Sequence, residues 1–249
     1  MNKKRPTVAD VARLTGVSMM TVSRVMNDMP GVSEATRQRI RETAQQIGFR
    51  PSQIARGLAT RHSATIGLVM PDVSNPFFAQ IARGAEDAAY EQGYSLFLIN
   101  TAESPEREKS ALDTLWQQEI DGAILSSPRL PTDTLYPIIE RFPAVVLVNR
   151  ELEKPRQGIG TINVDDRLGA QMAVKKFLAL GRRRIGHLAG PDTSISSRRR
   201  LEGYREALIE SSVGFDLNLV EHCIPLTEGG CEGAHRLLER RPDLDAIFC

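Results

Sequence analysis

Apolar residues near the start of the chain recur at helical spacing. Between Val8 and Ala12 they follow the i, i+3, i+4 pattern of one helix face. Thr7 can cap this helix, because Asp10 stands three residues later as the partner of a capping box. The pattern predicts a first helix that begins after Thr7 and ends at Gly16.

Two more helices are expected before residue 50. Ser18 can cap a second helix over 18–26, and Ser33 can cap a third helix that Gly48 ends in a left-handed conformation. The positions expected to point inward are Val22, Val25, Met26, Ile40, Ala44 and Ile47. Helix, tight turn, helix and supporting helix form a helix-turn-helix pattern, whose second helix reads DNA. The same pattern also fits a small structural three-helix unit without a ligand.

Charge distinguishes these two interpretations. Residues 1–61 carry eleven Lys and Arg residues against four acids, a net charge of +7. The remaining 21 basic and 27 acidic residues give −6, so the overall charge of +1 hides a basic head on an acidic body. This asymmetry favours a head that binds a polyanion such as DNA.

From residue 64 the pattern changes to short apolar runs that alternate with amphipathic stretches. The runs read ATIGLVMP, SLFLINT, DGAILSS, AVVLVNR, GIGTINVD, RIGHLAG and DAIFC. Helices are expected over 76–93, 105–118, 132–141, 165–180, 196–210 and 228–240. Strands that alternate with helices of this length predict an α/β fold with parallel sheets.

Polar and aromatic residues follow the predicted strands, where open parallel sheets bind ligands. The set is Asp72, Asn75, Phe77, Phe78, Asn100, Ser126, Asn149, Arg150, Asp192 and the segment SISSRRR at 194–200. Amides, hydroxyls, arginines and an aromatic face suit a sugar or a nucleoside. Simpler interpretations exist, because Asn75 and Asn100 fit ordinary turns, Phe78 fits the core equally well, and Arg199 and Arg200 fit a solvated face.

No catalytic constellation is found. The residues His62, His187, His222 and His235 have no catalytic partner at a useful spacing, and the pair Asp165–Asp166 resembles a helix N-cap. Three late cysteines lack metal-site spacing, and GIG at 158–160 is too short for a dinucleotide site. We therefore expect a protein that is not an enzyme and uses no cofactor or metal. No signal peptide or membrane span is predicted, which indicates a cytoplasmic protein.

The head resembles a known family. The stretch TVADVARLTGVSMMTVSRVMND, followed by VSEATRQRIRETAQQIGFRPSQIARGLAT, is similar to the head of the lactose-repressor (LacI/GalR) family of bacterial transcription regulators. The resemblance implies that Met19, Met20 and Arg24 read base edges. Arg24 can donate two hydrogen bonds to guanine, whereas methionine can only pack on thymine methyls or sugar surface. Many family members carry polar or aromatic residues at 19 and 20, so the resemblance implies DNA binding but does not give the target sequence.

The segment 50–61 fits a flexible linker, whereas the resemblance implies a hinge helix there that becomes ordered when two subunits pair on the minor groove. Leu58 matches the side chain that is inserted into the central base step, Ala55 permits close approach of two hinges, and Arg56 lies near the phosphates. The full set of expected DNA contacts is Thr7, Ser18, Met19, Met20, Thr21, Ser23, Arg24, Asn27, Ala55, Arg56 and Leu58.

The rest of the chain resembles the family's regulatory domain, which is similar to periplasmic sugar-binding proteins and has two α/β lobes around a ligand cleft. The expected domains are 1–49, 50–61, 62–162 and 163–249, with the last lobe incomplete. Family members run on for roughly another 80–100 residues, so a truncated product is expected. The expected effector-binding residues are Asp72, Phe77, Phe78, Asn100, Ser126, Asn149 and Arg198, of which Arg198 and Asn149 match effector positions.

These observations predict a repressor that binds a palindromic operator in double-stranded DNA as a homodimer. A sugar-like or nucleoside-like effector between the lobes would control it. The alternative is a solute-binding module of the periplasmic type without gene regulation, which does not account for the basic head. A sugar-processing enzyme lacks a nucleophile or an acid/base pair.

Overall fold

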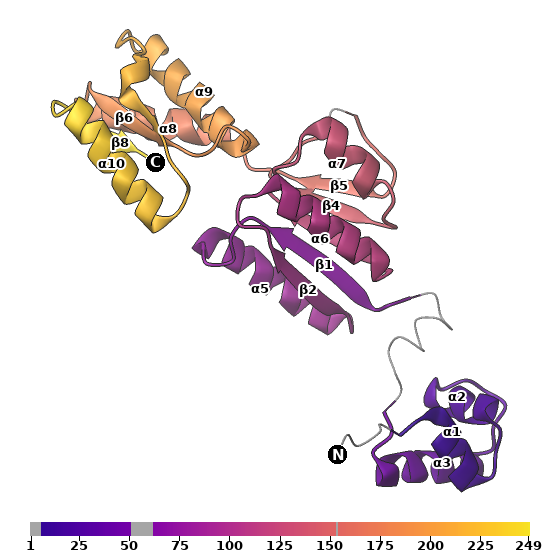
Figure 1. The fold of residues 1–249 in the computed structure, drawn as a ribbon. Helices are drawn as coiled ribbons and strands as arrows, with labels where there is room; N and C mark the ends of the chain where they lie inside the picture. Colours follow the sequence, from indigo (N-terminus) through magenta and orange to yellow (C-terminus); the bar gives the residue numbers. More distant parts are fainter. Residues whose placement is uncertain (1–5, 51–61, 153) are drawn as a thin grey trace. The chain divides into compact units, whose positions relative to one another are not determined.

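The computed structural model describes residues 6–50, 62–152 and 154–249 of the chain (Figure 1). The chain divides into two compact units, Met1–Ala64 and Thr65–Cys249. The expected hinge contacts at Ala55, Arg56 and Leu58 lie outside the described residues.

Residues 6–50 of the first unit form three helices, each with the side-chain cap that the sequence predicts. They are α1 (Val8–Thr15), α2 (Met19–Met26) and α3 (Glu34–Ile47). Thr7, Ser18 and Ser33 accept hydrogen bonds from backbone N–H groups in the first turns, which would otherwise lack intrahelical partners. Gly16 and Gly48 follow α1 and α3 with φ angles of 68° and 71°, a left-handed conformation that glycine adopts without strain.

The three helices share one small core. Val11, Val22, Val25 and Ile40 are at most 1% exposed, and Phe49 closes the cluster beyond the end of α3. Most of the inward positions predicted from the sequence are therefore buried, while Met26 and Ile47 are half-buried at its edge. This core fixes which side of α2 faces outward.

A five-stranded parallel sheet begins the second unit, in the order β2-β1-β3-β4-β5. Its strands are β1 (Thr65–Met70), β2 (Ser95–Asn100), β3 (Gly122–Ser126), β4 (Val145–Val148) and β5 (Ile159–Ile162). One face packs on α5 (Pro76–Glu91), and the other packs on α6 (Pro105–Gln117) and α7 (Thr132–Ile139). Gly67 lets α6 approach the sheet, because a Cβ at this position would lie 2.6 Å from a methyl carbon of Leu115.

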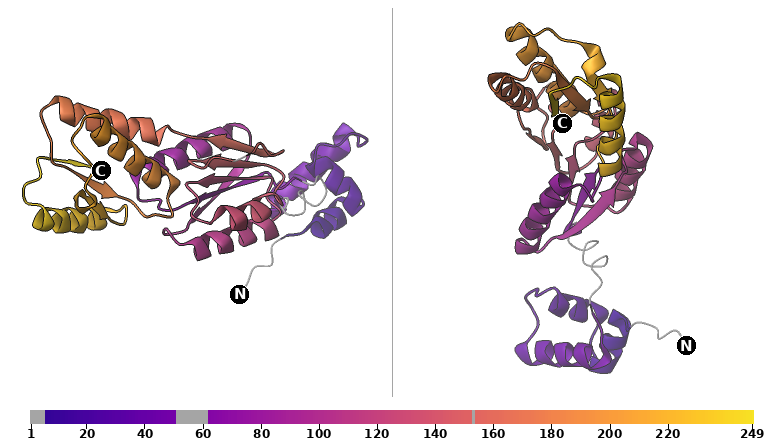
Figure 2. Two further views of the ribbon diagram at one scale, coloured as in Figure 1. Left: turned by 90° about the horizontal axis from the view of Figure 1, so that it is seen from above. Right: turned by 90° about the vertical axis from the view of Figure 1, so that its left-hand side faces the viewer.

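A second parallel sheet has the order β7-β6-β8. Its strands are β6 (Ile185–Ala189), β7 (Val220–His222) and β8 (Ala246–Phe248), and its helices are α8 (Asp166–Ala179), α9 (Ile195–Glu210) and α10 (Thr227–Arg240). Helices α8 and α9 cover one side of this sheet and α10 the other (Figure 2). Because β7 and β8 both pair with β6 in parallel, the carboxyl ends of all three strands lie at one edge of this sheet.

The alternation of strands and helices predicted from the sequence is confirmed, with one omission. The strand β7 and the 3-10 turn before it, Leu217–Leu219, were not predicted. Only three residues form β7, and two of them are Glu221 and His222, so no apolar run marks it. Of the helices that the structure describes, none is both long and apolar enough to cross a bilayer.

Candidate functional site

Helix α2 presents one face to the core and the opposite face to its surroundings. At about 100° per residue, Met20 points about 170° away from the midpoint between the buried Val22 and Val25. Met20 is 72% exposed and Met19 is 58% exposed. Arg24 lies one turn after Met20, so two thioether side chains and one guanidinium share this outer face.

Arg24, like Arg39 and Arg50, makes no ion pair within residues 6–50, whereas Arg13, Arg37 and Arg41 do. Arg13 binds Asp10 at 2.9 Å, and Arg41 binds Asp28 at 2.6 Å. Arg24 is exposed and makes no ion pair among the described residues. Its guanidinium can therefore donate two parallel hydrogen bonds to a planar acceptor such as a guanine edge.

Several other expected DNA contacts serve the helices themselves. The Thr7 hydroxyl donates to Asp10 at 2.8 Å, and Ser18 Oγ accepts from the Thr21 backbone N–H at 3.1 Å. Asn27 Nδ2 donates to the Ser23 carbonyl at 3.0 Å. These residues fix the ends of α1 and α2, and of the set only the Ser23 side chain lies on the exposed outer face beside Arg24.

A cleft of about 410 Å³ lies at the carboxyl ends of the strands in the second unit. Residues from the helices, loops and strands around both sheets line it, among them Phe77, Phe78, Asn149, His187, Ser197 and Arg200. Phe77 is 45% exposed and meets the buried Phe78 edge to face, with 5.2 Å between ring centroids. Asn149, with a φ of 56°, donates from Nδ2 to Ser127 Oγ at 3.3 Å. The cleft thus joins an aromatic face to amide and hydroxyl groups.

Four expected effector residues do not line this cleft. Asp72 accepts from the hydroxyl and the N–H of Ser74, and Asn100 accepts from the Val73 N–H at 2.9 Å, so both stabilise the loop after β1. Ser126 is buried in the strand β3. Arg198 is exposed and borders a separate groove on the outer side of α9.

The arginines that follow Arg198 remain in contact with solvent, since Arg199 is half-buried and Arg200 is exposed, but both also make ion pairs. Arg199 Nη1 binds Glu151 at 2.8 Å, and Arg200 Nε binds the buried Asp166 at 2.8 Å. Arg200 also lines the cleft. On α9 it points about 200° away from Arg198, which explains why one of the two arginines reaches the cleft and the other does not.

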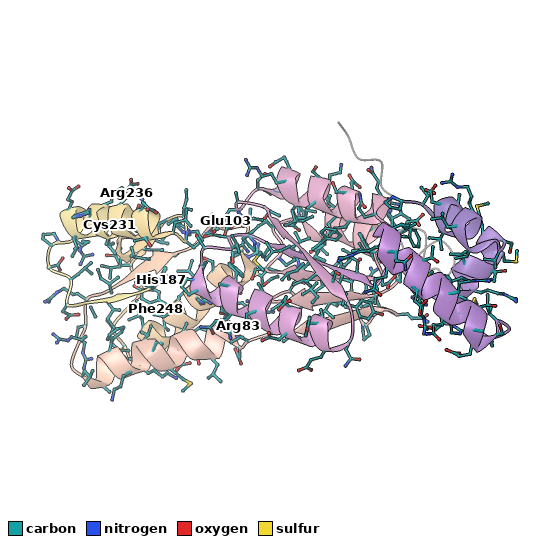
Figure 3. The ribbon with its side chains drawn as sticks, turned by 90° about the horizontal axis from the view of Figure 1, so that it is seen from below. Arg83, Glu103, His187, Cys231, Arg236 and Phe248 are labelled. Carbon is teal, nitrogen blue, oxygen red and sulfur yellow. The ribbon has the colours of Figure 1, made fainter. Side chains whose placement is uncertain are left out.

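His187 lies in the middle of β6 and is 1% exposed. Its ring stacks on Phe248 with 4.9 Å between centroids, and Nδ1 lies 3.1 Å from the Phe248 carbonyl (Figure 3). Burial lowers the pKa of His187 to about 4, despite the hydrogen bond to Phe248. The ring is therefore neutral at physiological pH.

A buried ionic cluster supports the other wall of the cleft. Arg129 lines the cleft and binds Glu103 through Nε at 2.6 Å. Glu108 accepts from the Arg129 backbone N–H at 2.6 Å, and burial raises the pKa of Glu108. The loop after β3 is thereby held in place, so the Arg129 charge is already balanced before any ligand enters.

Sequence reasoning missed His187, Arg129 and Arg200 as cleft residues. The signal for His187 was present, because a histidine inside the apolar run RIGHLAG is unusual in a buried strand. The run Arg198–Arg200 does not indicate from the sequence which of its arginines reaches the cleft. Their partners lie in other parts of the chain and are known only from the fold.

Comparison with known proteins gives two family matches. Residues 63–249 match the model described as periplasmic binding proteins and sugar binding domain of the LacI family. Residues 7–52 match the model of bacterial regulatory proteins, lacI family. The transcriptional regulator GalR of Escherichia coli K12 is 34% identical over 243 residues, which cover 98% of this chain and 70% of GalR.

Solved structures agree with these matches. A transcriptional regulator of the same family from Silicibacter pomeroyi superposes with a TM-score of 0.81 at 27% identity, covering 97% of this chain and 72% of that one. The complex of the regulator CelR with cellobiose gives a TM-score of 0.64 at 31% identity, covering 98% of this chain and 73% of that one.

Proposed function

The chain belongs to the LacI family of bacterial regulatory proteins, and from this we propose that it is a cytoplasmic repressor without catalytic activity. It binds a palindromic operator as a homodimer and responds to a small effector held in the cleft. The observation that carries the proposal is the outer face of α2, where Met19, Met20 and Arg24 are exposed and Arg24 has no ion-pair partner among the described residues.

Electrostatics supports the assignment of DNA to this face. The net charge of +7 on residues 1–61 attracts the phosphate backbone, and the acidic remainder of the chain does not compete for it. Phosphate contacts position the head, and the side chains of α2 then meet base edges in the major groove. Solute binding of the periplasmic type does not account for this face.

The cleft supports a polar, ring-shaped effector. Phe77 offers an exposed ring for stacking, Asn149 offers an amide from the loop after β4, and Arg200 offers a guanidinium from α9. This combination suits a sugar or a nucleoside. The relative CelR was solved with cellobiose, which is consistent with a sugar at the corresponding site.

The edge strand β2 supports the dimer. Among the strands that the structure describes, it pairs with β1 alone, and Phe97 and Leu98 on it are 54% and 40% exposed. Tyr90 on α5 is 78% exposed, and α5 packs against β2. A second copy of the chain would remove this apolar surface from water, and two heads would read the two halves of a palindrome.

The experiment is selection of bound duplexes from random DNA by the purified 249-residue chain, followed by titration at several salt concentrations. We expect a palindromic consensus whose affinity falls as salt rises. Arg24→Ala should lower affinity for the selected site by about 1–3 kcal/mol and relax the preference at one base pair per half-site. Arg39→Ala is the matched control, because it removes the same charge from an exposed position on α3 and should leave the base preference unchanged. Binding without any sequence preference would contradict the proposal.

A further inference from the structure

His187 carries a polar atom that the fold leaves unsatisfied. His187 is buried in β6 and is one of the residues that line the cleft, yet its Nε2 has no hydrogen-bond partner among the described residues. An unsatisfied buried polar group is unfavourable, and native structures keep few of them. Among the residues that line the cleft, Asn149 Oδ1 is the other buried side-chain atom without a partner in the described part of the chain.

The other ring nitrogen determines what Nε2 can do. A carbonyl oxygen can only accept a hydrogen bond, so Nδ1 must donate its proton to the Phe248 carbonyl, 3.1 Å away. In a neutral imidazole the second nitrogen then carries a lone pair and no proton. Burial keeps the ring neutral, since it lowers the pKa to about 4. Nε2 is consequently a hydrogen-bond acceptor and not a donor.

Aromatic packing holds the ring in this orientation. Phe248 stacks on it with an interplanar angle of 19°, and Tyr204 lies on it at a centroid distance of 5.2 Å. Tyr204 is itself fixed, because its hydroxyl donates to the Ile185 carbonyl at 2.8 Å. Rotation of the imidazole would break the Phe248 hydrogen bond and this stack, so the acceptor position does not change.

We propose that His187 is a specificity-determining residue of the cleft, whose Nε2 accepts a hydrogen bond from an O–H or N–H group of the effector. The proposal rests on the proposed function of the cleft as an effector site. It selects ligands that present a donor, such as a free hydroxyl of a sugar, at this position. It disfavours ligands that place a carboxylate, a phosphate or an ether oxygen there, because two acceptors would face each other.

The test begins with calorimetric titration of the full chain with D-galactose, D-ribose, cellobiose and cytidine. Each compound that binds is then replaced by its set of monodeoxy analogues, and the titrations are repeated with His187→Phe, which keeps an aromatic ring but has no acceptor. In the wild type, removal of one particular hydroxyl should weaken binding about tenfold, the loss expected when a buried polar atom stays unpaired. In His187→Phe the same removal should change binding by less than about twofold.

His222→Phe is the matched control. It makes the same chemical change on the neighbouring strand β7, outside the cleft lining, and should keep the wild-type pattern of deoxy effects. If every hydroxyl deletion has the same effect in His187→Phe as in the wild type, the proposal is overturned.

A spectroscopic measurement covers the case in which His187→Phe does not fold. In ¹⁵N-histidine-labelled wild type, ligand binding should shift the Nε2 resonance of His187 in the direction expected when an unprotonated ring nitrogen begins to accept a hydrogen bond. A ligand that binds and leaves this resonance unchanged would overturn the role of His187 alone. Failure of all four compounds to bind would overturn both this role and the sugar or nucleoside class of effector, while DNA binding would be judged separately.

Discussion

The exposed methionine at the centre of the α2 outer face leads to a prediction about the operator. A thioether cannot donate a hydrogen bond, so the favourable base contact for Met20 is an apolar one, and the only methyl group in the major groove belongs to thymine. Met20 and Arg24 lie one helical turn apart on the same side. We expect the selected half-site to place a thymine near the guanine that Arg24 reads.

The perturbation is the replacement of single thymines in the selected duplex by deoxyuridine, which deletes one methyl group and preserves base pairing. Met20 is 72% exposed in the structure, so nearly its whole side chain is available for burial against DNA. Burial of one methyl contributes about 0.8 kcal/mol, which corresponds to about a fourfold change in Kd. One thymine per half-site should show this loss.

The assay is fluorescence anisotropy at a fixed salt concentration, with wild-type protein and Met20→Ala on both duplexes. In the variant the uracil duplex should bind as well as the thymine duplex, because the side chain that contacts the methyl has been removed. An equal penalty for uracil in both proteins would refute the reasoning. It would mean that the methyl acts through the shape of the DNA and not through Met20.

Three further predictions concern stability and assembly. Gly203→Ala should destabilise the chain by about 1–3 kcal/mol, because a Cβ there would lie 2.1 Å from the Arg167 carbonyl oxygen, whereas Gly169→Ala has open space and should not lower the melting temperature. The pKa of His187 is lowered from 6.5 to about 4, so the unfolded chain takes up its proton first as the pH falls. As the pH falls from 6.5 to 4, urea denaturation should show that the wild type loses about 3 kcal/mol of unfolding free energy that His187→Phe does not lose. Equal pH profiles of the two proteins would contradict this. Phe97→Glu should shift the dimer toward monomer in sedimentation analysis, and an unchanged dimer would exclude this face.

Local physics explains which parts of the structure could be predicted. The caps at Thr7 and Ser18 and the glycine at 16 act within one helical turn, so the sequence places the helices of the head correctly. Most of the parallel strands are rich in apolar residues, and their runs are equally visible. Strand β7 could not be seen, because it is short and polar and its pairing with β6 comes from the fold.

The cleft was harder to predict, since its membership depends on directions that the sequence does not contain. Short polar side chains after strands, such as Asp72 and Asn100, satisfy nearby backbone groups and do not reach the cleft. Arg198 and Arg200 are chemically identical, and only the rotation of α9 against the sheet decides which one faces Asp166. Phe77, Phe78 and Asn149 do line the cleft, and their roles in binding remain predictions.

The side-chain caps of α1, α2 and α3 have a consequence for how the protein is made. Each cap joins residues three positions apart, and the whole core of the head lies within residues 8–49, a compact local topology that folds quickly. At a synthesis rate of about 5–20 residues per second, the head can form on the ribosome well before the first sheet is complete. Evolution can therefore exchange such a head between unrelated sensor bodies without refolding either part.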